Sequence, residues 1–317
     1  MTLPRRVVAG AIQFVTRRTS LRRFLLVPTA EIHALLLYCA AVAAQRYGIQ
    51  LHAFAWMSNH VHFVLTDPRG NLPSFMRWFG HNTSCALNRR YGRTGKDVIW
   101  DPTGSYDNVR LWDAAVVEQK LLYTLLNPVA AGLVPRAQDW HGGVSLPQHF
   151  GRTLKVRRPQ GYFKQKGPTA LPETVELTLT RPYLLDELYP TDRRYRESLA
   201  KQLSQAERER QQEFKRAKRR FLGLAAARRV DPQSQPKNFD SQEATRLVWP
   251  FQCSDPVFRD HLEEDHLRFL SEAVETFPVW NDEVTRPTAV FPHGSYRWVR
   301  VHGARVAPRP DWDPAPP

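Results

Sequence analysis

The turn Met57-Ser58-Asn59 constrains the fold more than any other feature of the sequence. It separates two runs of strand-like length and composition, 51–56 and 60–66, in which apolar, β-branched and aromatic residues predominate. A connection this short joins neighbouring antiparallel strands. The two runs are therefore predicted to form an antiparallel hairpin.

Helices and one further strand are predicted around this hairpin, because apolar residues recur at helical spacing on both sides of it. Gly48 should end the first helix. Asp113 is a candidate N-cap of the third, which should end near Asn127 because Pro128 disfavours helical geometry in the residue before it. The order of these predicted strands and helices along the chain predicts an α+β domain over 1–150, with an antiparallel sheet covered by helices. The predicted elements are a strand over 7–16 and helices over 29–46, 71–91 and 113–127.

Beyond residue 150 the composition changes. Residues 151–172 are rich in Gly, Pro and basic side chains, which predicts a linker lying near nucleic acid. Residues 173–305 are predicted to form a mostly helical accessory region that includes a long helix over roughly 193–229. The Pro-rich tail over 306–317 is predicted to be disordered.

The chain is strongly basic, with 45 Lys and Arg against 31 Asp and Glu and a net charge of +14. Such an excess is unlike an ordinary metabolic enzyme and indicates a polyanionic partner. The longest apolar run, 32–44, is shorter than the ~20 residues that span a bilayer, and no small-residue cleavage site follows the N-terminus. We expect a cytoplasmic, nucleoid-associated protein with no membrane partner. Its three scattered cysteines fit reduced thiols better than a disulfide framework.

Two histidines in the second strand of the hairpin are the first candidate site residues. Side chains alternate along a strand, so His60 and His62 are expected on one face while Val61 and Phe63 point to the other, toward the helices. Two imidazoles on one face make half of a metal site. For a bare His-x-His pattern the alternative is favoured, namely a hydrogen-bonded pair on a sheet surface.

A tyrosine in the third predicted helix is the second candidate. Asn127 lies four residues after Tyr123, and Gln119 and Lys120 lie one turn before it, so these side chains share a helix face. A tyrosine beside an amide and an ammonium group is unusual on a core helix. Taken alone, however, Tyr123 would more often pack the helix against the sheet.

Taken together, these segments resemble the HUH-type single-tyrosine transposases, in particular the REP-associated tyrosine transposase branch of the IS200-like family. Residues 57–62 are similar to that family's Met-Pro-Asn-His-Val-His strand, with Ser58 in place of proline. Residues 123–134 are similar to its Tyr-x-x-x-Asn-Pro-Val-x-x-Gly-Leu-Val segment, with Leu125 at a position that is often histidine. Residues 100–107 look like its Trp-x-x-x-Gly-Tyr-Tyr-Asp stretch. The resemblance covers about residues 4–145, and the region beyond 150 is longer than is typical of the branch.

The resemblance implies a ferredoxin-like catalytic domain and a chemistry for these residues. His60, His62 and Asn127 would hold a divalent ion, Mg²⁺ or Mn²⁺, since two imidazoles, an amide oxygen and open positions suit such an ion better than a closed zinc site. Tyr123 would attack the scissile phosphate and form a 5′-phosphotyrosine, with Lys120 as a nearby cation and Gln119 in a supporting position. Tyr106 is the reserve nucleophile.

The expected substrate is single-stranded or hairpin DNA, because the tyrosine must reach an unpaired phosphodiester. Arginines and tryptophans could hold its backbone and stack its bases, although a core position is the more frequent one for each tryptophan. A basic helix face further along the chain could hold phosphates or could simply be solvated, and whether a homodimer forms is left open. The candidate DNA-binding residues are Arg89, Arg90, Arg93, Lys215, Arg216 and Arg219, with Trp56, Trp78, Trp100 and Trp112.

Two competing functions remain open at this point. The first is a domesticated hairpin-DNA-binding protein that keeps the fold without turnover. The second is a metal-dependent phosphodiesterase in which water, not tyrosine, attacks. Only the transposase chemistry leaves a covalent adduct between protein and DNA.

Overall fold

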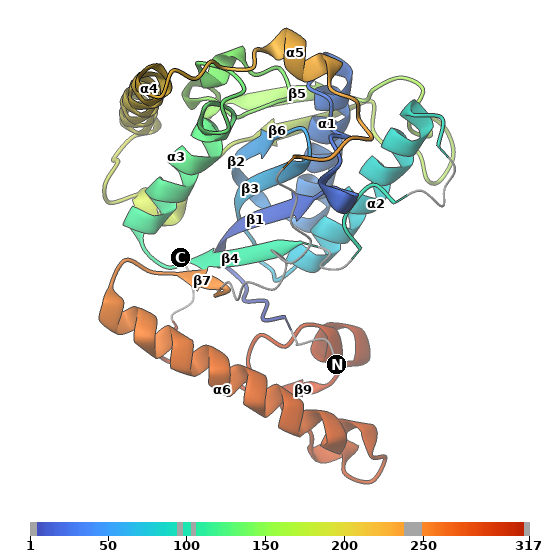
Figure 1. Cartoon of the computed structure of the whole chain (residues 1–317). Helices are drawn as coiled ribbons and strands as arrows, with labels where there is room; N and C mark the ends of the chain where they lie inside the picture. The colour runs from blue at the N-terminus through green and yellow to red at the C-terminus, as the bar shows by residue number, and fades with distance from the viewer. Residues whose placement is uncertain (1–4, 94–97, 103–105, 238–248, 314–317) are drawn as a thin grey trace.

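The predicted hairpin is present and occupies one side of a five-stranded sheet (Figure 1). The structure, a computed structural model, describes residues 5–93, 98–102, 106–237 and 249–313. The sheet is built from β1 (Ile12–Arg18), β2 (Gln50–Trp56), β3 (His60–Thr66), β4 (Asp107–Leu111) and the short β7 (Phe251–Gln252). Its strand order is β2-β3-β1-β4-β7. The first four strands are antiparallel to their neighbours, and β7 is parallel to β4.

Two helices connect these strands, α1 (Ala30–Tyr47) and α2 (Leu72–Arg90). The resulting β-α-β-β-α-β order with four antiparallel strands is the ferredoxin-like arrangement. The predicted α+β class, with an antiparallel sheet covered by helices, is thereby confirmed. The first strand begins at Ile12 rather than at residue 7, because Gly10 adopts a positive φ of 81° and turns the chain just before it.

The two faces of the sheet carry different helices. On one face Phe63 of β3 packs against Phe75 and Phe79 of α2, and α1 lies beside α2. On the other face lies α3 (Ala114–Ala130), whose N-cap Asp113 accepts a hydrogen bond from the backbone N–H of Val116 at 2.9 Å. The face under α3 is the one that carries His60 and His62.

Helix α3 continues through Pro128 to Ala130, so the predicted end near Asn127 is wrong. A proline inside a helix removes one backbone hydrogen bond. Here Asn127, Pro128 and Val129 are all buried, and the burial of this last turn outweighs that single loss.

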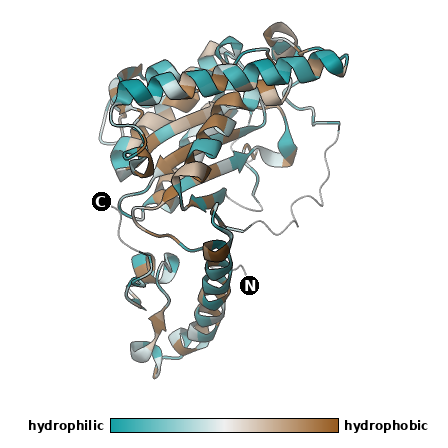
Figure 2. Cartoon of the chain, turned by 90° about the vertical axis from the view of Figure 1, so that its left-hand side faces the viewer, coloured by the Kyte–Doolittle hydropathy of each residue, from teal (hydrophilic) through white to brown (hydrophobic). Residues whose placement is uncertain are grey.

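The region beyond residue 150 differs from the prediction in three places. Residues 151–172, expected to be a linker, contain β5 (Thr153–Arg157), which pairs with β6 (Thr174–Thr178) and buries Val156 against α1. The predicted long helix is two helices, α4 (Asp192–Arg216) and α5 (Leu224–Arg229), because Lys218 and Gly223 have positive φ values that break it. The outer surface of α4 is almost entirely hydrophilic (Figure 2).

The third difference is the tail, where the expectation of disorder is wrong for the residues that the structure describes. After α6 (Pro256–Asn281) and the strands β8 (Val290–Phe291) and β9 (Arg305–Val306), the chain returns to β4. There the fully buried carboxylate of Asp313 accepts hydrogen bonds from Arg110 and Arg309. No helix among the described residues is both long and apolar enough to cross a membrane. Single-turn helices lie at Ser20–Arg22, Ala137–Asp139, Pro147–His149, Tyr183–Leu185 and Arg286–Thr288, with a short π-helix at Arg297–Val301.

Candidate active site

The two histidines of β3 lie side by side on the face under α3, with ring centroids 4.7 Å apart. Each ring is held at Nδ1. The His60 Nδ1–H donates to the Asn59 side-chain oxygen at 2.7 Å, and His62 Nδ1 lies 2.9 Å from the Thr16 hydroxyl on the neighbouring strand. Fixing one ring nitrogen in this way orients the other, Nε2, for coordination.

Both imidazoles are neutral at pH 7. Burial lowers the pKa of His60 to about 4, with smaller contributions from the charges of Arg18 and Arg22. Burial also lowers the pKa of His62 well below its ordinary value, assisted by His60, Arg18 and Lys120. Neutral imidazole is the form that binds a metal ion.

His62 Nε2 is buried and has no hydrogen-bond partner among the described residues. A buried nitrogen without a partner is unfavourable unless it binds another group, and coordination of a divalent cation would satisfy it. The residues present therefore fit a metal ion. Within the described part of the chain no three His, Cys, Asp or Glu side chains are grouped as ligands, so further donors would have to be oxygens of another kind, such as a side-chain amide or a substrate phosphate.

Tyr123 reaches this face from α3. Its ring centroid lies 5.6 Å from that of His62 and 5.7 Å from that of Phe14, both in edge-on geometry. Phe14 in turn stacks on His62, with ring centroids 5.0 Å apart, so its ring packs against both His62 and Tyr123. Tyr123 remains 45% exposed, so a substrate can reach this residue from solvent.

The other predicted residues of α3 differ in their surroundings. Lys120 Nζ lies 5.0 Å from the centre of the Phe14 ring and 5.3 Å from that of Tyr123, and burial lowers its pKa. Asn127 is buried one turn beyond Tyr123 on the same helix, whereas Gln119 is exposed one turn before it. The structure thus brings Lys120 and Tyr123 to the histidines and keeps Gln119 at the surface.

The predicted DNA-binding arginines of the first domain lie away from this face, at the end of α2. Arg90 forms an ion pair with Glu31 at 2.8 Å. Arg89 and Arg93 line a separate pocket on the opposite side of the sheet. The reserve nucleophile Tyr106 is buried beneath the Arg5 guanidinium, which lies 3.8 Å from the centre of its ring.

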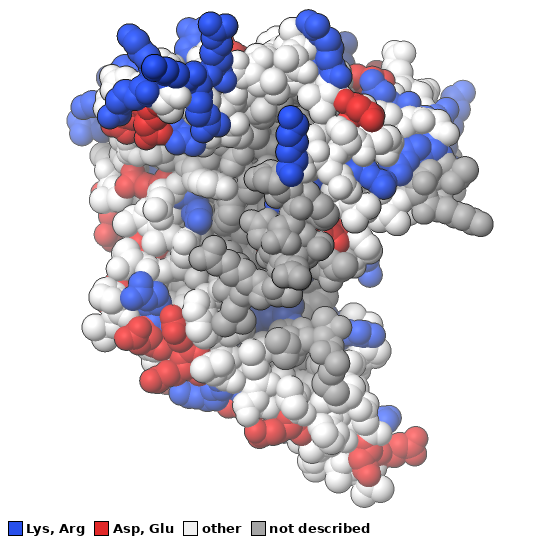
Figure 3. Space-filling view, viewed as in Figure 1, with Lys and Arg blue, Asp and Glu red and all other residues white. Residues whose placement is uncertain are grey.

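The predicted basic residues of the second half lie at the end of α4 and just after it. Lys215, Arg216 and Arg219 are exposed, and Arg219 covers the Phe214 ring at 4.5 Å. Lysine and arginine gather over this part of the surface, as Figure 3 shows at upper left. Of the four tryptophans, Trp56 and Trp100 are buried in the core, and Trp78 and Trp112 are partly buried.

Four residues at the site were not predicted from the sequence: Thr16, Arg18, Arg22 and Asn59. Thr16 and Arg18 face His62 and His60 because β1 pairs with β3 in the register Thr16↔His62 and Arg18↔His60. That register depends on tertiary pairing and gives no local signal. For Asn59 a signal existed, since a turn amide directly before His60 can accept a hydrogen bond from its ring.

Comparison with known proteins gives one family match. Residues 11–108 match the family described as "Transposase IS200 like", which confirms the predicted resemblance to the IS200-like family. The matched segment contains His60 and His62 and ends before Tyr123. The match supports a general role in DNA processing of the transposase kind. None of the curated proteins compared with this chain matches it.

Two solved structures have limited similarity to the chain. The first, described as a REP-associated tyrosine transposase bound to a REP hairpin, is 19% identical, with a TM-score of 0.37 over 44% of this chain and 79% of that one. The second, a proposed transposase from Deinococcus radiodurans R1, is also 19% identical, with a TM-score of 0.27 over 34% of this chain and 85% of the other.

Proposed function

We propose that this protein nicks single-stranded or hairpin DNA and transfers the strand through a 5′-phosphotyrosine at Tyr123. The observation that carries the proposal is the meeting of an exposed tyrosine with two neutral, oriented imidazoles on one sheet face. The IS200-like match over 11–108 supports the same class of reaction.

The tyrosine would act as the nucleophile. Its phenolic oxygen attacks phosphorus and loses its proton, the bond from phosphorus to the 3′-oxygen breaks, and the departing 3′-oxygen takes up a proton. The new ester preserves the energy of the phosphodiester, so a second 3′-hydroxyl can reverse the step and join a different strand. A neutral phenol is a weak nucleophile, so it needs a cationic neighbour as it attacks, and Lys120 is placed for this role.

Three cationic side chains would hold the scissile phosphate. Arg18, Arg22 and Lys120 are close enough to the imidazoles for their charges to lower the histidine pKa values. The same field attracts an anionic phosphate and stabilises the extra charge that develops on it during attack.

His60 and His62 would hold a divalent ion through their Nε2 atoms, with Asn127 as the proposed third donor from α3. Such an ion, Mg²⁺ or Mn²⁺, would polarise the phosphate oxygens as a Lewis acid. The chain's own contribution is to keep both rings neutral and to fix their orientation through Thr16 and Asn59.

A 3′-labelled single-stranded oligonucleotide tests the proposal. Incubated with the wild-type protein and Mn²⁺, it should yield a denaturation-resistant adduct on Tyr123, and Tyr123→Phe should abolish the adduct while preserving folding and DNA binding. Tyr106→Phe is the matched control and should behave as wild type. An adduct that survives in Tyr123→Phe but not in Tyr106→Phe would reverse the assignment.

The same assay separates the competing functions. Cleaved DNA without any adduct would indicate attack by water and hence a phosphodiesterase. Tight hairpin binding with neither cleavage nor adduct would indicate a DNA-binding protein without turnover. His60→Ala and His62→Ala should each abolish cleavage while DNA binding, carried by distributed phosphate contacts, persists.

A further inference from the structure

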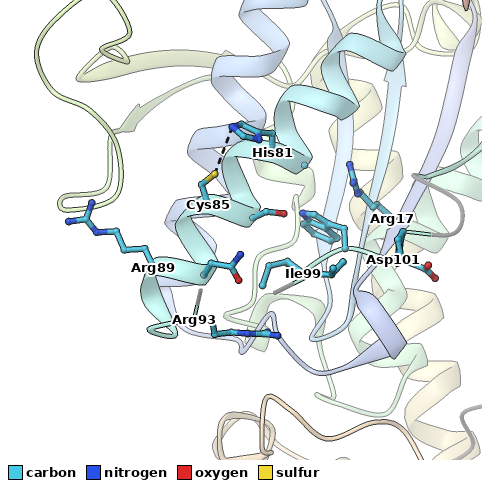
Figure 4. A pocket seen from close by; sticks show the side chains of 13 residues that line it. Arg17, His81, Cys85, Arg89, Arg93, Ile99 and Asp101 are labelled. Carbon is cyan, nitrogen blue, oxygen red and sulfur yellow. Dashed lines mark hydrogen bonds between the residues drawn. The ribbon is translucent and has the colours of Figure 1, made fainter. Parts of the chain in front are cut away.

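A second group of basic side chains lines a pocket on the face of the sheet opposite the histidines (Figure 4). The pocket has a volume of about 700 Å³ and lies between the C-terminal half of α2, the end of β1 and residues 98–102. This volume falls within the ~300–1,000 Å³ typical of small-molecule sites. Its lining includes Arg17, Ser84, Arg89, Arg93, Val98 and Asp101.

Arg17 is the central group of this pocket. Its Nη1 donates to the Met76 carbonyl at 2.9 Å, and its guanidinium lies directly against Gly80, where a Cβ atom would come within 2.1 Å of Nη1. Burial lowers the pKa of Arg17 to about 10, so the cation is poorly solvated. Its Nε is buried without a hydrogen bond, and no carboxylate of the described residues forms an ion pair with the side chain.

A poorly solvated guanidinium without a counter-ion is costly unless an anion is supplied. The rest of the lining favours an anion as well, because Arg89 and Arg93 add positive charge and Asp101 is the one carboxylate among the described lining residues. In Figure 4 Arg89 extends outward from the helix, whereas Arg93 extends beneath the pocket on the side of Ile99. Val98, which is 47% exposed, supplies an apolar surface at the same pocket.

The pocket and the candidate active site lie back to back. Arg17 and Arg18 are consecutive in β1, so their side chains point to opposite faces of the sheet. On one face, the charge of Arg18 helps to lower the pKa of His60. At the rim of the pocket, the Arg18 carbonyl accepts a hydrogen bond from the Asp101 N–H at 3.0 Å. A DNA strand with one phosphate at the histidines can therefore reach the pocket by passing around the end of a single strand.

We propose that this pocket binds one unpaired nucleotide flanking the cleaved phosphodiester, with its phosphate on Arg17 and its base toward Val98. The inference rests on the proposed function, because it assumes that DNA occupies the histidine face. The ligand chemistry is that of a phosphorylated nucleoside, whether within a strand or free in solution.

Calorimetric titration of the full chain with three probes tests this inference: tetrathymidylate, thymidine monophosphate and inorganic phosphate. Arg17→Met keeps most of the side-chain volume and removes the charge. It should weaken tetrathymidylate and thymidine monophosphate about tenfold or more, the effect of one charge-assisted hydrogen bond. Arg46→Met, which removes an exposed arginine at the end of α1, is the matched control and should change either affinity less than twofold.

Each other result would overturn part or all of the inference. Equal affinities in wild type and Arg17→Met would remove the nucleotide site. Inorganic phosphate binding as tightly as the nucleotide would leave an anion site without base recognition. If Arg17→Met fails to fold, Ser84→Trp decides instead, because it fills the pocket from α2 while Arg17 itself is kept, and it should abolish nucleotide binding.

Failure of this inference can be told apart from failure of the proposed function. If wild type forms the adduct and Arg17→Met binds the nucleotide as tightly as wild type, the nucleotide site is refuted while the nickase function is retained. Arg17-dependent nucleotide binding without any adduct on Tyr123 would do the reverse.

Discussion

At the scale of single residues, the orientation of the two histidines depends on two oxygen atoms from other parts of the chain. Thr16 comes from the neighbouring strand and Asn59 from the hairpin turn, and each engages an Nδ1 atom. Both imidazoles are thereby fixed before any ligand arrives, which lowers the cost of assembling the site.

Thr16→Val tests this role, because it removes the hydroxyl and keeps the shape of the side chain. We expect the nicking rate to fall about 10- to 100-fold, with more Mn²⁺ needed for half of the maximal rate. The free energy of unfolding should fall by only about 1 kcal/mol. Thr66→Val is the matched control, since Thr66 is buried in β3 but bonds to His52. An equal loss of rate in both variants would contradict a positioning role for Thr16.

His52 gives a pH dependence that is independent of the candidate site. Its ring is 1% exposed and bonds to the Thr180 carbonyl and the Thr66 hydroxyl, and burial lowers its pKa to about 4. In the unfolded chain the pKa is about 6.5, so the unfolded state binds more protons between these two values. Stability should be full above pH 6.5 and fall by about 2–3 kcal/mol as the pH drops to 4.5.

Urea unfolding of wild type and His52→Gln at pH 7 and pH 4.5 measures this contribution. The variant should lose less stability on acidification than wild type by about that amount. Parallel losses in the two proteins would show that His52 is not the titrating group.

Much of the candidate site could be predicted from single residues and their spacing. Strand alternation placed His60 and His62 on one face, and the motif order brought Tyr123 into the same hypothesis. Strand register could not be predicted, so Thr16 and Arg18 were not recognised as site residues from the sequence. The pocket at Arg17 was not recognised for the same reason, because it is formed by residues from β1, α2 and the segment before β4.

At the scale of elements, the junction between α3 and α4 depends on Gly132. This residue has a φ of +73°, and a Cβ atom there would lie 2.7 Å from the Phe214 ring. The glycine of the Asn-Pro-Val-x-x-Gly segment thus both turns the chain after α3 and admits a side chain from α4. It couples the candidate catalytic helix to the second half of the chain.

Gly132→Ala should destabilise the protein by about 2–4 kcal/mol, through left-handed backbone strain of roughly 1 kcal/mol plus displacement of Phe214. Gly161→Ala is the control, because Gly161 also has a positive φ of 81° but no atom lies within 4 Å of its would-be Cβ. Denaturant titration of both variants isolates the packing contribution. Equal losses would assign the whole effect to backbone strain.

The elements of the first 150 residues were predicted better than those that follow. There, apolar periodicity and turn residues agree with the tertiary structure. In 151–172, Gly, Pro and basic residues masked the alternation of exposed Lys155 and Arg157 with buried Val156. The break between α4 and α5 was missed because it occurs at Lys218, a residue that rarely adopts a positive φ.

At the scale of the whole molecule, charge is unevenly distributed. Lysine and arginine cluster over α4 at the top of the view in Figure 3, whereas acidic side chains gather over α6 at the bottom. DNA should therefore approach the first of these surfaces and avoid the second. The net charge of the sequence alone does not reveal this separation.

Neutralising Lys215, Arg216, Lys218 and Arg220 to Gln tests the α4 surface as a DNA contact. All four side chains are exposed, and Arg219 is left unchanged because it covers Phe214. The slope of log affinity against log salt for single-stranded DNA should flatten by up to about 3, at ~0.7 per phosphate contact. An unchanged slope in a folded variant would indicate a merely solvated surface.

The short strand β7 has a consequence for how the protein is made. It pairs with β4, which would otherwise be the open edge of the sheet, and Asp313 closes over Arg110 of the same strand. On the ribosome, strands β1 to β4 emerge long before residues 249–313. For that interval the nascent domain exposes an unpaired β-edge, the kind of surface on which neighbouring chains aggregate. The distal residues therefore cover the β4 edge of the sheet only after its first four strands have been synthesised.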